Sequence, residues 1–445
     1  MKIKEQKKNL SNTETKEKKE KKEKKVPIDK HGRPMKRRAF PRKPVYIAAV
    51  LLMGIATIVF LAMLILADLL PPDLTIILTV IVIALLLLTC FMLSSRYRWK
   101  RIVGIAIGLI FVLVLGSVTG FMKSTFETMN KISSAGIQAE GPLAKSIDVT
   151  QEPFNIYITG IDQWEDEKGF DLERSDVNMI VTVNPRTKKV LLTSIPRDSY
   201  IKLHTAQQMD KLTHTGVYGV DETINTVQDW LGIDLNYYVK MNFTAVRDII
   251  NAMGGVRVYS PVAFDSSLRD YHYDKGWNEL GGREALFFAR ERHAFEGQDS
   301  IRVENQQRLM KAMIDKMTSS TTLLTKYGDV MDAAGDNLTT NMSADDMMAL
   351  VKMQITELAE WDIESQKMEG EYGEDYVASL SQKNKYSVYY VDPKSLTKCI
   401  DGIESVMNPS VSDLEKASKS MSRSFIVNYL GHLRDSVVNI KNEDE

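Results

Sequence analysis

Three long apolar runs without a charged residue limit what the first 121 residues of this chain can fold into. They cover residues 45–67, 74–93 and 102–121. Each is close to the roughly 20 residues that a helix needs to cross the hydrocarbon core of a bilayer. We therefore expect three transmembrane helices, followed by one large water-exposed part. A cleaved signal peptide is the alternative, but three successive runs do not favour it.

Basic residues near these runs predict the orientation of the chain in the plasma membrane. One group directly precedes the first run, and a second group fills the loop between the second and third runs: Arg37, Arg38, Arg42 and Lys43, then Arg96, Arg98, Lys100 and Arg101. Positively charged loops stay on the cytoplasmic side. The N-terminus is therefore expected inside, and everything beyond residue 121 outside.

The two ends of the chain carry opposite charge. Residues 1–44 hold 18 Lys and Arg against 6 Asp and Glu, a net charge of +12, while residues 122–445 hold 35 against 50, a net charge of −15. Almost nothing apolar interrupts the lysines and glutamates of residues 2–25, so this segment cannot bury enough surface to offset its chain entropy. We expect residues 1–44 to be a disordered basic cytoplasmic tail.

Beyond the third run the pattern changes to that of a globular domain. Residues 122–150 are mixed and polar, as in a stalk or a helical neck, and residues 151–408 alternate between β-rich runs and helical periodicity. The predicted strands are 154–158, 178–183, 190–193, 237–241 and 256–259, and the predicted helices are 221–231, 244–253, 283–289, 301–317, 344–352 and 395–407. This mixture indicates an α/β domain, and residues 409–445 are expected to form a helical tail of unknown role.

Charged residues cluster where three of the predicted strands begin or end. If the turn after residue 183 makes strands 178–183 and 190–193 an antiparallel hairpin, the start of one lies beside the end of the other. Four charged side chains then lie at one sheet edge. Asp162 lies there too if strand 154–158 runs antiparallel to strand 178–183. The four are Arg174, Asp176, Arg197 and Asp198.

A second charged cluster lies between residues 289 and 307. Arg302 and Gln306 are four positions apart and share a helix face. Arg290 and Arg292 are two positions apart, so they reach a common ligand only where the helix has ended. Glu291 and Glu304 are candidates to neutralise part of this charge by local pairing.

Carboxylates and arginines gathered at one site are costly to desolvate unless a ligand accounts for them. A magnesium-bound pyrophosphate is such a ligand, because Mg²⁺ takes carboxylate and phosphate oxygens and the guanidinium fork matches phosphate. Surface salt bridges are the alternative for any one Arg–Asp pair. Cys90 and Cys399 offer no Cys-based metal site, and the sequence contains no Walker motif, Rossmann glycine fingerprint or nucleophile elbow.

The order of short motifs resembles a known family. The segments GID, RSD, SIPRD, AMGGVRV, REALFFARER, DSIR and NQQ follow one another over about residues 152–408, as in the LytR-CpsA-Psr cell-wall ligases, and three preceding spans resemble its streptococcal capsule-associated members. The resemblance implies an extracellular α/β/α domain with a central mixed sheet, in a Gram-positive bacterium. It also implies an apolar tunnel for a polyprenyl chain, with the pyrophosphate at its mouth. The activity implied is transfer of capsular polysaccharide, wall teichoic acid or a related glycopolymer to peptidoglycan.

The resemblance also implies roles for single residues. Asp162 and Asp176 would hold Mg²⁺, and the phosphates would be bound by Arg174, Arg197, Lys211, Arg290, Arg292, Arg302 and Gln306. Lys211 matches its motif only partly, because Thr213 stands where the family has Asn. Arg197 and Arg290 would also act in catalysis by neutralising the leaving group. Asp299 is the candidate general base, with a helix N-cap as its alternative role.

Two other functions compete with the ligase. One is a membrane-bound transcriptional regulator of envelope polysaccharide genes, with the basic tail on DNA, but residues 2–25 offer no recognition helix, so specific nucleic-acid binding is not expected. The other is a noncatalytic glycan-binding wall protein. The partners expected for the ligase are a polyprenyl-pyrophosphate-linked glycopolymer, peptidoglycan and the membrane.

Overall fold

A computed structural model describes residues 43–67, 72–134, 147–161, 175–294, 299–319, 322 and 326–414. The predicted basic tail up to residue 42 and the tail beyond residue 414 lie outside these ranges. Asp162 and Arg174 also lie outside them.

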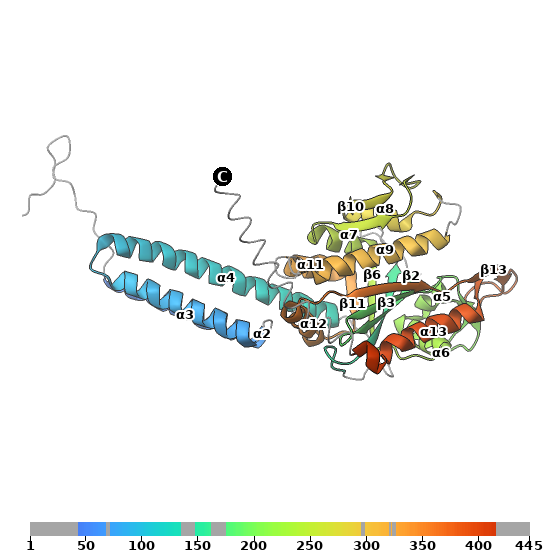
Figure 1. Ribbon diagram of the computed structural model, residues 1–445, viewed down its shortest axis with the longest axis horizontal. Helices are drawn as coiled ribbons and strands as arrows, with labels where there is room; N and C mark the ends of the chain where they lie inside the picture. The colour runs from blue at the N-terminus through green and yellow to red at the C-terminus, as the bar shows by residue number, and fades with distance from the viewer. Residues whose placement is uncertain are drawn as a thin grey trace, which may run out of the picture.

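Three long apolar helices form one end of the molecule (Figure 1). They are α2 (Lys43–Ala67), α3 (Pro72–Ser94) and α4 (Arg98–Ser134), and each contains a segment long and apolar enough to cross a membrane. The predicted three apolar helices are therefore confirmed. With 37 residues α4 is about 55 Å long at 1.5 Å per residue, well beyond the roughly 30 Å hydrocarbon core. Its last turns therefore continue into the segment that we expected to be a stalk.

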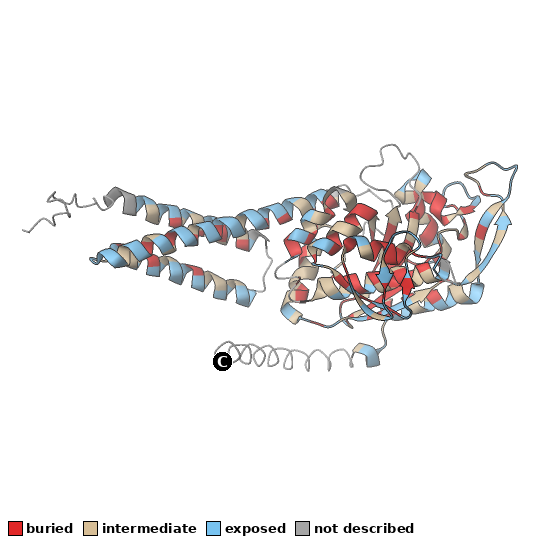
Figure 2. Ribbon diagram, turned by 90° about the horizontal axis from the view of Figure 1, so that it is seen from above, coloured by how far each residue is buried: buried red, intermediate tan, exposed pale blue. Residues whose placement is uncertain are grey.

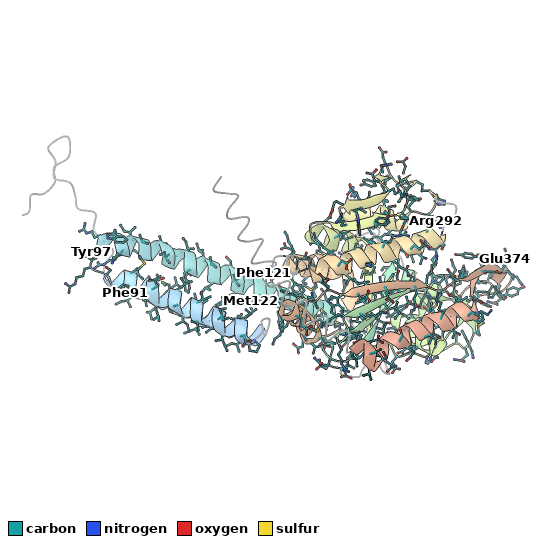
Figure 3. The ribbon with its side chains drawn as sticks, in the orientation of Figure 1. Phe91, Tyr97, Phe121, Met122, Arg292 and Glu374 are labelled. Atoms are coloured by element: carbon teal, nitrogen blue, oxygen red, sulfur yellow. The ribbon has the colours of Figure 1, made fainter. Side chains whose placement is uncertain are left out.

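The end of α4 packs directly on the globular domain. The Met129 side chain is fully buried and packs with Tyr327 of α11 (Tyr327–Ala334) and Met348 of α12 (Ala344–Glu357). The Phe121 ring fills the space beside Gly328, so any side chain at position 328 would collide with it. Figure 3 labels Phe121 and Met122 where the helix meets the domain. The third apolar helix thus holds the domain at a defined distance from the other two.

A six-stranded mixed sheet is the centre of the domain. Its order is β11 (Leu338–Thr340), β6 (Tyr237–Asn242), β1 (Phe154–Ile161), β2 (Ser175–Asn184), β3 (Lys189–Ser194) and β12 (Asp362–Lys367). The pairs β1/β6 and β3/β12 are parallel, and the other three pairs are antiparallel. Helices flank this sheet on both sides, so the predicted α/β/α class is confirmed.

The two faces of the sheet meet different helices. Side chains alternate between faces along a strand. Tyr157, Ile180 and Leu191 point toward α6 (Val220–Leu231) and α13 (Pro393–Met407). Ile158 and Met179 point the other way, toward α9 (Asp299–Thr318). Figure 2 shows buried residues concentrated around the sheet and exposed residues along α2, α3 and α4.

The remaining elements form a layer beside α9 and several short hairpins. The layer contains α7 (Phe243–Ala252), α8 (Gly282–Arg290), β7 (Val256–Ser260), β8 (Phe264–Asp265), β9 (His272–Tyr273) and β10 (Gly276–Leu280). The other short elements are β4 (Tyr200–Lys202), β5 (Met209–Lys211), α5 (Leu212–Thr215), η2 (Gly216–Tyr218), η3 (Gly335–Asn337), β13 (Gly370–Asp375) and β14 (Tyr386–Val391). The strands and helices predicted between residues 154 and 407 are all present, with α12 extending to Glu357. Strands β12, β13 and β14, the shorter strands, α5 and α11 were not predicted; β12 and β13 are largely polar, and the shorter elements carry little periodicity.

Candidate active site

Antiparallel pairing brings the first charged cluster together. Ile161 at the end of β1 pairs with Ser175 at the start of β2, and Met179 of β2 pairs with Ser194 at the end of β3. The predicted hairpin and the assumed antiparallel return of the first strand are both confirmed. The residues that follow β3 therefore lie beside the first residues of β2, close to Ile161, the last residue of β1.

A continuous ionic network occupies this sheet edge. The Arg197 guanidinium forms an ion pair with the Asp176 carboxylate, and its Nε atom lies 3.5 Å from Oδ2 of Asp198. Asp198 Oδ1 in turn accepts a hydrogen bond of 3.1 Å from the Lys211 Nζ atom. The four side chains are only 14–31% exposed, so they are screened less than pairs on the surface. Asp176, Arg197, Asp198 and Lys211 are called the Arg197 network below.

Backbone hydrogen bonds hold Lys211 against the turn that carries Arg197, between β3 and β4. The Thr213 amide donates to the Arg197 carbonyl at 2.8 Å, and the Leu212 amide donates to the Ser199 carbonyl at 2.9 Å. Thr213 contributes here through its main chain, so the departure from the family motif at this position does not displace Lys211.

A buried polar group that we did not predict lies behind Lys211. Asp210 is fully buried and accepts hydrogen bonds of 2.7 Å from the amides of Lys211 and Ser379. The His214 Nδ1 atom is also 2.7 Å from Asp210. Burial alone would raise the pKa of Asp210, but the hydrogen bonds from His214, Lys211 and Ser379 lower it overall. This group ties β5 to the loop after β13, a contact 169 positions apart that no local pattern indicates.

The second cluster begins where α8 ends. Arg290 is the last residue of this helix, and Glu291 already has an extended backbone with ψ 132°. The guanidinium carbon of Arg290 lies 4.4 Å from the centre of the Phe243 ring. Arg292 is exposed, with its Nε atom 3.1 Å from Nε2 of His293. The helix therefore ends at the position that allows Arg290 and Arg292 to face one ligand.

The expected pairing of Glu291 and Glu304 with these arginines is wrong. Glu291 is fully buried and accepts hydrogen bonds from the Ser267 amide at 2.7 Å and from the Ser266 hydroxyl at 2.9 Å. Burial raises the pKa of Glu291, but these bonds and those from Ser267 Oγ and the Ala294 amide lower it overall. Glu304 instead pairs with Arg308 and Lys367. Glu291 thus shapes the turn after α8 by accepting its amide hydrogens.

Helix α9 brings further candidates to the same place. Arg302 is 9% exposed, and Gln306 one turn later lines a cavity. The Gln307 amide donates to Ser194 Oγ at 2.9 Å, which joins α9 to the end of β3. Asp299 is the first residue of α9, and its side chain lies outside the described atoms, so its role as a base stays a prediction.

Two apolar cavities lie between α9 and the sheet. The first, of about 70 Å³, is polar where Asn242, Arg290 and Gln306 line it, and Gly160 and Val177 also contribute to its lining. The second, of about 300 Å³, lies further along the same face. Ile158 and Met310 line both cavities. The remaining lining of the second is almost wholly apolar and includes Phe154, Ile156, Val181, Val183, Val190, Ile314, Met317, Tyr327, Leu350 and Trp361.

Phe287 and Phe288 line neither of these cavities. The Phe288 ring packs on Phe264 and Tyr273 in the core instead. Leu286 and Ala289 from the same helix face the first cavity.

The described residues offer limited ligands for a metal ion. Within them there is no group of three or more His, Cys, Asp and Glu side chains arranged to hold a cation. Asp176 supplies one carboxylate, and the second predicted ligand, Asp162, lies outside the described ranges. Mg²⁺ is commonly held by one or two carboxylates together with substrate phosphates and water. This donor set therefore fits a cation that arrives with a phosphate ligand.

The fold and the site together define a class of protein. An apolar cavity lined in part by Arg290, with Arg197 and Lys211 in a network at the neighbouring strand ends, suits a lipid with an anionic phosphate headgroup. Residues 118–402 match the LytR_cpsA_psr family, and the chain belongs to that family.

Individual relatives agree with this assignment. The chain is 31% identical over 277 residues to the polyisoprenyl-teichoic acid–peptidoglycan teichoic acid transferase TagU of Bacillus licheniformis, covering 61% of this chain and 84% of that protein. It is 32% identical over 260 residues to TagU of Bacillus cereus, covering 57% and 83%. A solved structure of TagT bound to LIIa-WTA is 27% identical with a TM-score of 0.49, covering 62% of this chain and 98% of that chain.

Proposed function

We propose that this protein transfers a glycopolymer of the teichoic acid type from a polyprenyl-pyrophosphate carrier to peptidoglycan, on the outer side of the plasma membrane. The observation that carries this proposal is the pair of apolar cavities under α9, the first of which is lined in part by Arg290 and Gln306, near the Arg197 network. Family membership and the names of the relatives support the same reaction.

The two ends of the donor match the two ends of the cavities. A polyprenyl chain is apolar along its length and gains free energy when buried among Ile158, Val181 and Met310. Its pyrophosphate then lies at the polar end, within reach of Arg290 and Arg197. Guanidinium groups bind phosphate oxygens through two parallel hydrogen bonds. Burial of the lipid thereby positions the bond that is to break.

The transfer exchanges one phosphorus–oxygen bond for another. An acceptor sugar hydroxyl attacks the phosphorus atom attached to the glycopolymer, and the bond from this phosphorus to the bridging oxygen breaks. Polyprenyl phosphate leaves with the electron pair, and the hydroxyl proton passes to a base, for which Asp299 stays our candidate. Arg197, Arg290 and Lys211 stabilise the charge that develops on the leaving phosphate, since positioning and electrostatics dominate phosphoryl transfer.

Mg²⁺ is the proposed cofactor, held by Asp176 and Asp162. When bound, it would neutralise charge on the pyrophosphate. The ion pair of Asp176 with Arg197, the arginine proposed to bind the phosphates, supports this role. The basic residues between α3 and α4 support a cytoplasmic N-terminus and an external domain. The regulatory alternative relies on residues 1–42, and nothing in the described part of the chain favours it.

The test uses the full-length protein in detergent with a lipid-linked donor and peptidoglycan. Arg197→Lys keeps the charge but loses the bidentate fork, so transfer should fall about tenfold or more, as expected for roughly 1.4 kcal/mol of lost transition-state stabilisation. Arg186→Lys is the matched control, because Arg186 is exposed in the turn at the other end of the same hairpin. A chelator should also lower transfer and donor affinity.

Two results would contradict parts of this proposal. Unchanged turnover in Arg197→Lys would remove the role of the fork, and equal activity with and without chelator would remove Mg²⁺. Absence of polyprenyl lipid in the purified protein, together with no transfer from added donor, would reject the function itself.

A further inference from the structure

The hairpin of β13 and β14 projects from the end of the domain opposite α2, α3 and α4 (Figure 1). Figure 3 labels Glu374 at this end, far from Phe121 where α4 enters the domain. With α4 coming from the membrane, this hairpin is the part of the molecule that points away from the membrane.

The hairpin is attached to the Arg197 network through its backbone. The Tyr389 amide of β14 donates to the Asp198 carbonyl at 2.8 Å, and Tyr389 forms a parallel bridge with Ser199. The adjacent strand β4 begins with Tyr200, whose cross-strand partner is Lys211. Paired residues lie on the same face of a sheet, so Tyr200 shares its face with a residue of the network.

Tyrosine rings continue from Lys211 outward along this face. The rings of Tyr200 and Tyr390 meet edge to face with centres 5.6 Å apart, and the Tyr200 hydroxyl donates to the Tyr376 carbonyl at 2.8 Å. Tyr376 and Tyr390 remain 43% and 42% exposed. We call the rings of Tyr200 and Tyr390 the tyrosine platform.

The orientation of the Tyr390 ring is held by its surroundings. The ring lies over Gly373, where an added Cβ would come within 2.6 Å of it. Its hydroxyl donates to Asp375 Oδ2 at 2.9 Å. An aromatic ring that is exposed yet fixed in place loses little conformational freedom when it binds a ligand.

We propose that the tyrosine platform binds the glycan strand of the peptidoglycan acceptor and leads it to the Arg197 network. This inference rests on the proposed function. Sugar rings present apolar C–H faces that stack on aromatic rings, while their hydroxyls bond to the polar atoms around them. The platform lies at the end of the domain that points away from the membrane, where the proposed function places the peptidoglycan. It adjoins Lys211, one of the residues that would bind the donor phosphates.

Charge favours the acceptor over the donor polymer as the occupant. Glu371, Glu374 and Asp375 lie on the same hairpin. The backbone hydrogen bond from Tyr376 and the bond from the Tyr390 hydroxyl lower the pKa of Asp375, so it is ionised at neutral pH. Lys383 and Lys385 in the connection between the two strands offset two of these three carboxylates, and the remaining negative charge disfavours a polymer of repeating phosphates relative to an uncharged sugar strand.

The test measures binding of peptide-free peptidoglycan glycan strands to the full-length protein in detergent, without donor. Tyr390→Ala should weaken binding about five- to tenfold, in line with the value of a stacked ring. Tyr390→Phe keeps the ring and should bind within about twofold of the wild type. Tyr372→Ala is the matched control. Tyr372 is on the same hairpin and 53% exposed, but it pairs with Tyr389 and so lies on the opposite face.

In the transfer assay, Tyr390→Ala should raise KM for the acceptor by a similar factor and leave donor binding and kcat at saturating acceptor unchanged. The proposal is overturned if Tyr390→Ala binds glycan like the wild type, if Tyr372→Ala loses as much, or if purified teichoic acid polymer binds the platform better than the strands. If the protein binds glycan through Tyr390 but shows no transfer activity, the proposed function is rejected while the glycan-binding role of the platform stands.

Discussion

The two faces of the central sheet are built from alternate residues of the same strands, yet one face is closed and the other is hollow. Toward α6 and α13, Tyr157 and Ile180 are fully buried in a continuous core. Toward α9, Ile158 and Val181 border apolar cavities. The hollow face is the more apolar of the two in sequence, since Ile156, Ile158, Val181 and Val183 of that face alternate with Asn155, Thr159 and Thr182 of the closed face. The difference shows that hydrophobicity predicts which residues are shielded from water. It does not predict whether they pack against other side chains or line a cavity.

A cavity of about 300 Å³ lined almost wholly by apolar side chains loses dispersion contacts that a filled core would provide. Such a space is retained at a cost in stability unless a ligand fills it. A ligand bound at the hollow face would restore these contacts.

The largest expected difference between the faces comes from the same truncation made on each. Ile180→Ala on the closed face should lower the free energy of unfolding by about 3–5 kcal/mol, because neighbours cannot fill the space. Ile158→Ala, on the neighbouring strand, should cost about 2 kcal/mol, since part of its surroundings is already empty. Thermal unfolding of the full-length protein without added lipid measures both. Equal losses would mean that the two faces are packed alike.

Enlarging a side chain should affect bound lipid on the hollow face and stability on the closed face. Val181→Phe extends into the larger cavity, so stability should change by less than about 1.5 kcal/mol while co-purifying lipid is lost. Val227→Phe in α6, where Val227 is fully buried, should cost about 1–3 kcal/mol through overpacking and leave lipid binding intact. Mass spectrometry of bound lipid is the second measurement. Normal lipid content in Val181→Phe would show that the cavity is not the lipid site.

The smallest effect concerns the polar contacts that hold α9 over the hollow face. Burial alone would raise the pKa of Glu304, but Lys367 and Arg308 lower it overall. A carboxylate with a lowered pKa stabilises the fold above its unfolded pKa of about 4.3 and loses this contribution as pH falls through the folded value. Glu304→Gln should therefore cost less than about 1 kcal/mol at pH 7. Its difference from the wild type should shrink below about pH 4, and an unchanged difference at pH 3 would exclude the ionic origin.

Much of the site was predictable because it depends on strand pairing. A tight turn between two β-rich runs is enough to place Asp176 beside Arg197. The end of α8 at Arg290 is enough to give Arg292 a direction that helix geometry would not allow. Glu291 was misread because its partners, Ser266 and Ser267, come from a short connection that carries no pattern. The group formed by Asp210, His214 and Ser379 was missed for the same reason: its members meet only after the β13–β14 hairpin has packed on β5.

The sequence by itself determined the three apolar helices, the alternation of the central strands and the charged residues at the strand ends. These features depend on composition and on spacing along a few residues. Only the tertiary structure decided that one sheet face is closed and the other hollow, that α4 packs on the domain, and that the tyrosine platform adjoins the Arg197 network. The physical reason is that packing density and surface continuity are set by contacts between distant segments, such as Tyr389 with Asp198, whose sequence separation leaves no local signal.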